Sequence, residues 1–149
     1  MQAAFGGLIA VILLALYVHL IRVALHVVDC LNTTGCTKYA ATSFNDGMAQ
    51  ALAIIGGLVS ALVIAELAVT KPGEAPVARA LSQGASPLSV RALKIVTTFY
   101  VLVWIVAGLW AFVVGLYHPK DLPPLTSLGQ AWLGLAVASA YAYFGLKPK

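Results

Sequence analysis

The chain has 149 residues, of which 61% are hydrophobic and 9% charged, and its mean hydropathy is +0.94. In soluble domains roughly a quarter of the residues are charged, so a chain this apolar cannot cover its surface with polar groups in water. The composition excludes an ordinary soluble protein and predicts an integral membrane protein. Its nine basic residues outnumber five acidic ones. They are scattered rather than clustered, so we expect no nucleic-acid partner.

Four stretches of the chain are long and apolar enough to cross a bilayer, which takes about 20 residues of helix. They cover approximately residues 3–29, 48–69, 93–116 and 125–146. The sequence therefore predicts an all-α fold, a bundle of four transmembrane helices in a single domain over residues 1–149. The first stretch lacks a basic leading region and a small-x-small cleavage site, so we expect a retained span rather than a secretory signal.

Basic residues near the ends of these stretches predict the orientation, because Lys and Arg concentrate on the cytoplasmic side. Six lie in or beside the connection 70–92 and at the C-terminus: Lys71, Arg79, Arg91, Lys94, Lys147 and Lys149. The other side holds three: Arg22, Lys38 and Lys120. We therefore expect the N- and C-termini in the cytoplasm.

Two cysteines lie in the first connection, within the sequence DCLNTTGC. The predicted orientation places this connection outside the cytoplasm, where thiols can oxidise. The five residues between Cys30 and Cys36 differ from the C-x-x-C spacing of reactive dithiols. We therefore predict a structural disulfide between Cys30 and Cys36.

Small residues recur every four positions in two of the stretches, a spacing that lets transmembrane helices approach closely. The second stretch has Ala49, Ala53, Gly57, Ala61 and Ala65, and the fourth has Gly134, Ala138 and Ala142. We expect most of these residues to pack helices within one chain. The stripe on the second stretch is also suited to contact another subunit or to line a narrow path.

The second half of the first stretch carries His19, Arg22, His26 and Asp29. Their spacing of three, four and three places them on one face of a helix. One interpretation is a polar path near the outer leaflet, where imidazoles pass protons and Arg22 favours anions. The other is that Arg22 snorkels to the interface while the remaining polar face docks on the external loop.

Glu66 is the one acid inside an apolar run, and an acid within a span is a candidate ion site. It also lies close enough to the end of its stretch to reach the cytoplasmic interface. Two histidines seven positions apart do not form one metal site. We therefore predict neither a metal nor a cofactor.

The sequence has no Walker loop, G-x-S-x-G, H-E-x-x-H or dinucleotide motif, so we do not expect an enzyme. The first hypothesis is a small homo-oligomeric pore, channel- or holin-like, in a bacterial or phage-encoded inner membrane. The second is a non-catalytic subunit or assembly factor of a larger membrane complex. The third is a proton-coupled transporter of small solutes. The expected partners are the lipid bilayer and further copies of the chain or other membrane subunits.

Overall fold

The computed structural model describes the backbone of residues 2–68 and 87–144, and the side chains of residues 7–40, 42–65 and 95–141. Regular structure in these residues is wholly helical, which confirms the all-α prediction. The elements are α1 (Gln2–Asn32), a short 3-10 turn η1 (Ala41–Ser43), α2 (Asp46–Ala68), α4 (Pro87–Tyr117) and α5 (Pro123–Phe144).

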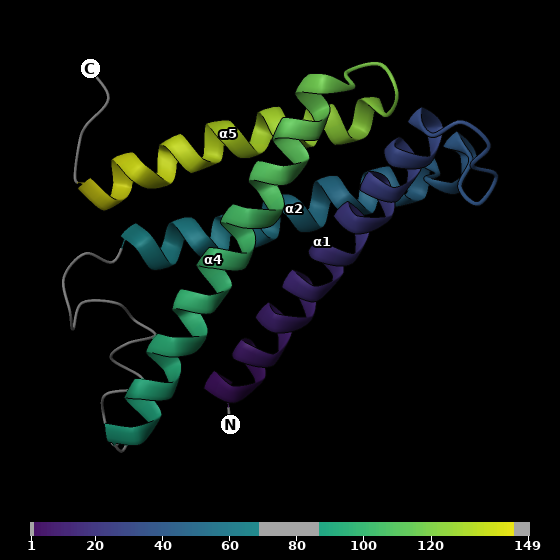
Figure 1. The fold of residues 1–149 in the computed structure, drawn as a ribbon. Helices are drawn as coiled ribbons and strands as arrows, with labels where there is room; N and C mark the ends of the chain where they lie inside the picture. The colour runs from purple at the N-terminus through teal and green to yellow at the C-terminus, as the bar shows by residue number, and fades with distance from the viewer. Residues whose placement is uncertain (1, 69–86, 145–149) are drawn as a thin grey trace.

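The four long helices form a bundle in which the order around the centre is α1, α2, α5, α4. Helices α1 and α4 run toward the same end of the molecule, and α2 and α5 run back from it (Figure 1). At that end Asn32 Nδ2 donates a hydrogen bond to Asp121 Oδ2 at 2.7 Å. This bond joins the end of α1 to the α4–α5 turn, so connections 33–45 and 118–122 lie together at what we call the loop end.

Three helices of the described residues are long and apolar enough to cross a membrane: Gly7–Asn32, Asp46–Ala65 and Ile95–Tyr117. The sequence prediction of four such spans therefore holds for three of them. Helix α5 does not qualify, because polar residues interrupt its apolar run. These residues are Thr126, Ser127, Gln130 and Ser139.

Helix α2 begins where its sequence supplies a cap. The Asn45 Oδ1 accepts a hydrogen bond from the Met48 N–H at 2.9 Å, which satisfies one of the free donors of the first turn. Asp46 follows in that turn, where a negative charge interacts favourably with the helix dipole. The start of α2 is thereby fixed at the loop end.

Aromatic side chains fill the centre of the bundle. Trp104 of α4 and Tyr17 of α1 are each only 1% exposed. The Trp104 Nε1 donates to Ser60 Oγ of α2 at 3.0 Å, so the one polar atom of the indole is satisfied. The Trp132 ring of α5 tilts against Trp104 at 54°, with ring centroids 5.6 Å apart. One indole thus contacts helices on two sides.

Glycines set the close contact between α4 and α5. A Cβ atom on Gly129 would lie 2.6 Å from Phe112 Cα, and one on Gly115 would lie 3.0 Å from Thr126 Cα. At Gly108 the space that a side chain would take is filled by the Trp132 indole. Such approach of backbones is the main source of helix association in lipid, which competes equally well for apolar side chains.

The glycine contact predicts the effect of adding a methyl group. Gly129→Ala forces the new Cβ against the backbone of α4, so we expect a loss of about 1–3 kcal/mol in the free energy of unfolding. Gly134→Ala on the same helix is the control, since its Cβ would meet nothing within 4 Å. Denaturant titration in detergent measures both variants. Equal stability of the two would contradict the packing described.

Candidate functional site

All four residues of the predicted polar stripe are exposed on one outward face of α1. His19, Arg22, His26 and Asp29 alternate with buried residues of the opposite face, such as Ala24, which is fully buried. The spacing prediction of a shared face is therefore met in the helix. Glu66 belongs to α2, but its side chain lies outside the described residues.

The register of α1 against α2 gives the depth of this stripe. A Cβ atom on Gly56 would lie 3.4 Å from the Tyr17 ring, and Gly56 is near the middle of the Asp46–Ala65 span. With that span centred in the bilayer, His19 and Arg22 lie about 3 and 7.5 Å from mid-depth along α1, at 1.5 Å a residue. The hydrocarbon extends about 15 Å to each side. This register therefore places both residues at hydrocarbon depth.

The outer half of the stripe has different surroundings. The same count puts His26 about 13.5 Å and Asp29 about 18 Å from mid-depth, at and beyond the hydrocarbon boundary. The His26 ring stacks on Tyr39 of the first connection, with centroids 5.8 Å apart and planes at 10°. The loop therefore folds back over this part of α1. The docking predicted for the polar face beyond Arg22 is present at His26.

Arg22 lies on the edge of a groove between α1 and α4. The groove has a volume of about 380 Å³, and Arg22 is the single charged residue that lines it. The other lining residues are Val18, Ile21, Leu25, Phe99, Leu102, Val103, Val106, Ala107 and Trp110. The ion pair found among the described residues joins His118 and Asp121, so no carboxylate described there neutralises Arg22.

Helix α2 turns most of its predicted small-residue stripe away from the core. Ala53, Gly57, Ala61 and Ala65 are exposed and Ala49 is half-buried. Packing within the chain uses the adjacent face, formed by Leu52, Gly56, Val59, Ser60 and Val63. The exposed stripe is therefore free of helix contacts in the described part of this single chain.

The predicted small-residue stripe of α5 is also turned away from the other helices. Gly134 and Ala138 are exposed, and the side chain of Ala142 lies outside the described residues. The contact of α5 with α4 passes instead through Gly129. Helix α5 therefore keeps a second small-residue surface that the described chain does not cover.

A second cavity of about 320 Å³ lies between α2 and α5, beside the contact of the two helices. Small residues of α2 form one wall, and Leu128, Ala131 and Leu135 of α5 form part of the other. Because α1 and α4 are neighbours on the other side of the bundle, this α2–α5 cleft and the α1–α4 groove lie on opposite faces. Neither cavity is lined by His19 or His26.

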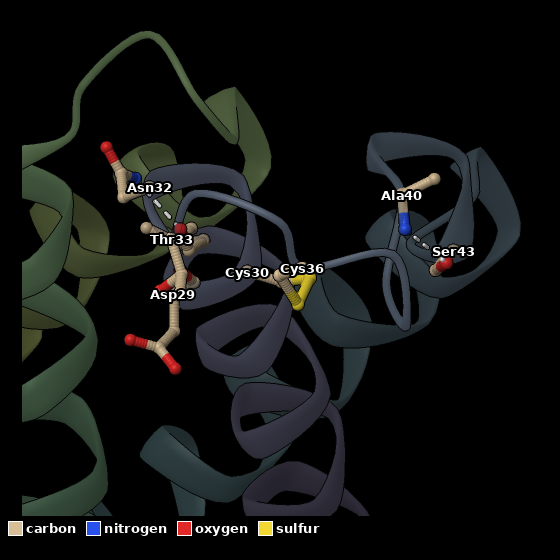
Figure 2. Close-up of a disulfide and its surroundings, with 8 residues drawn as sticks. Asp29, Cys30, Asn32, Thr33, Cys36, Ala40 and Ser43 are labelled. Carbon is tan, nitrogen blue, oxygen red and sulfur yellow. Dashed lines mark hydrogen bonds between the residues drawn. A yellow bond between two sulfur atoms is a disulfide. The ribbon is translucent and has the colours of Figure 1, made fainter.

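The predicted disulfide between Cys30 and Cys36 is present (Figure 2). The Cα atoms of Cys30, in the last turn of α1, and Cys36 are 5.3 Å apart. Gly35 has φ of 85°, a left-handed conformation that a glycine adopts without steric cost. Thr33 Oγ1 donates to the Asp29 carbonyl at 2.8 Å. Together these features reverse the chain directly after α1.

The polar contact between the end of α1 and the α4–α5 turn has no local pattern in the sequence. Asp121 Oδ2 accepts from Asn32 Nδ2 and lies 3.2 Å from His118 Nδ1. The motif YHPKDLPP contains two of the three residues, but their partner on α1 is 89 positions from Asp121. Only the folded arrangement of α1 and α4 brings them together.

The described residues thus define an all-helical protein with three helices of membrane-spanning character and an oxidised loop at one end. In the part of the chain that the structure describes, no three His, Cys, Asp or Glu side chains gather as a metal site. A scan against protein-family models and searches of curated proteins and of solved structures give no match.

The disulfide predicts a measurable dependence on reductant. Opening the short Cys30–Cys36 loop should cost about 2 kcal/mol of unfolding free energy, because the unfolded chain gains freedom. Chemical denaturation with and without reductant measures this difference. The C30S/C36S double variant should match the reduced protein and show no response to reductant. An oxidised protein no more stable than this variant would contradict a structural role.

Proposed function

We propose that this protein is a small homo-oligomeric membrane protein whose copies surround a polar path, of the channel- or holin-like kind. The observation that supports it is the exposure of His19 and Arg22 at hydrocarbon depth. An arginine facing lipid at the bilayer centre costs about 2.5–3.5 kcal/mol or more, and half-way to the hydrocarbon boundary Arg22 still bears part of this cost. Water in a path between copies, or a neighbouring subunit, removes much of that cost.

The outward surfaces of the helices favour one side of the bundle for the path. All four helices expose large apolar residues, but only α4 and α5 hold no charged residue within residues 95–117 and 123–141, which suits contact with lipid. Helix α1 is diagonally opposite α5 in the bundle. An assembly with α4 and α5 toward lipid therefore turns the polar stripe of α1 toward its axis.

In this proposal α5 also crosses the membrane, and both termini are cytoplasmic. Close contact at Gly115 and Gly129 holds α5 along α4, so the two helices share one depth. Two of the polar residues of α5 are covered by the bundle itself, since Ser139 is buried and Thr126 lies against Gly115 of α4. The distribution of basic residues supports the cytoplasmic termini, and the disulfide suits an oxidising compartment at the loop end.

A second candidate is a non-catalytic subunit of a larger membrane complex. The open surface of α5 at Gly134 and Ala138 favours it, because the proposed path does not use that surface. The mass of the solubilised particle separates the two functions: several identical chains support the first, and unrelated chains support the second. The proton-coupled transporter has no comparable support, since His19 and His26 line neither cavity.

Ion flux through vesicles containing the purified protein tests the proposed path. Arg22→Gln should lower this flux several-fold, because it removes the charged side chain that water or a neighbouring copy has to accommodate at hydrocarbon depth. Lys38→Gln is the matched control, because it removes the same charge from the exposed connection. Flux no greater than in protein-free vesicles would contradict the proposal.

A further inference from the structure

We propose that α2 of a second copy of this chain occupies the α1–α4 groove, so that copies join head to tail in a closed ring. The inference rests on the proposed function and names the surfaces that build the oligomer. The groove face is formed by Arg22, Phe99, Leu102, Val106 and Trp110. The small-residue face is formed by Asp46, Ala53 and Gly57 beside the α2–α5 cleft.

The placement of the two faces suits a ring. They lie on opposite sides of the bundle, because the helices follow the order α1, α2, α5, α4 around it. Each copy therefore presents one face to the copy before it and the other face to the copy after it. A contact between two different faces continues from copy to copy until the rotation closes.

The two faces are complementary in shape. Phe99 and Trp110 are 65% and 60% exposed on the groove face. On the other face, a Cβ added to Gly57 would meet nothing within 4 Å, and the α2–α5 cleft beside it measures about 320 Å³. Bulky side chains of one copy can therefore enter a surface of small residues on the next, which is how transmembrane helices gain packing energy.

The two faces are also complementary in charge. Asp46, Ala53 and Gly57 are seven and eleven positions apart along α2, so they share one line on the helix surface. The Tyr17–Gly56 contact marks mid-depth on both helices. Counted from it at 1.5 Å a residue, Asp46 lies about 15 Å and Arg22 about 7.5 Å toward the loop end. The difference is within the reach of an extended arginine side chain, which can snorkel toward the interface. Arg22 of one copy can thus pair with Asp46 of the next.

A symmetric contact between two groove faces lacks this complementarity. Copies related by an axis along the membrane normal keep equal residues at equal depth. Two groove faces in contact would therefore bring one Arg22 against another, and like charges at hydrocarbon depth repel strongly. The charges thus favour the small-residue face of the second copy as the occupant.

Cysteine cross-linking in membranes tests which faces meet. Gly57 and Val106 are each near the middle of their spans, so Gly57→Cys in one copy and Val106→Cys in another should form a disulfide-linked dimer on oxidation. The control pairs Gly57→Cys with Ile105→Cys, whose exposed side chain is at the same depth on another face of α4. The control should give at least tenfold less dimer. Equal yields from the two pairs, or dimer from the control alone, would overturn the assignment.

A charge exchange tests the ion pair independently. Arg22→Asp should convert the oligomer in a detergent particle to the monomer, and R22D/D46R should restore the original mass. Lys38→Asp should leave the mass unchanged. Retention of the disulfide and of native tryptophan fluorescence shows that each variant is folded. If a charge variant does not fold, the Gly57–Val106 cross-link still tests whether the two faces meet. An R22D/D46R protein that folds but stays monomeric would overturn the pairing.

The outcomes also separate this inference from the proposed function. A wild-type oligomer that conducts ions but gives no Gly57–Val106 cross-link would contradict the two faces and leave the proposed path intact. A wild-type particle with the mass of one chain, which does not conduct, would contradict both.

Discussion

Close approach between small residues is the interaction on which this bundle depends. In lipid an apolar side chain gains little by leaving its solvent, so helices associate where their backbones come near enough for dense van der Waals contact. Gly108, Gly115 and Gly129 provide that approach between α4 and α5, and Trp132 fills the space that Gly108 leaves. The hydrogen bond from Trp104 to Ser60 adds a directional contact between α4 and α2. Positions of this kind, rather than total hydrophobicity, determine which helices are neighbours.

Composition and spacing were sufficient to predict much of the fold. The apolar runs predicted the helices, and the cysteine spacing predicted the structural disulfide. The faces on which the helices pack were harder to predict from the sequence. Gly56 and Gly57 are equally small, and only the register with Tyr17 selects Gly56 as the residue in contact. In a soluble protein polar residues mark the outer face, whereas here lipid-facing and core-facing positions are alike in hydropathy. The difference between α5 and the other three helices was also hard to predict, because apolar residues flank the polar ones of α5 and make its stretch resemble the others in sequence.

The candidate site, too, could be predicted from the sequence only in part. Helical periodicity alone placed His19, Arg22, His26 and Asp29 on one face, since these positions belong to one continuous helix. The groove beside Arg22 could not be predicted in that way, because Phe99 and Trp110 come from a helix far along the chain. The Asn32–Asp121 bond is a further example. Local patterns specify what one helix presents, and tertiary register decides what it meets.

The hydrogen bond between Asn32 and Asp121 has a mechanical consequence. Together with the short α4–α5 turn and the Cys30–Cys36 bridge, it ties α1, α4 and α5 at one end of the molecule. Helices that are joined at one end are displaced least near the junction and most at their opposite ends. Tilting of α1, about 46 Å long at 1.5 Å a residue, would thus pivot at the loop end. Any widening between these helices would therefore be largest at the end of the bundle opposite the loop end.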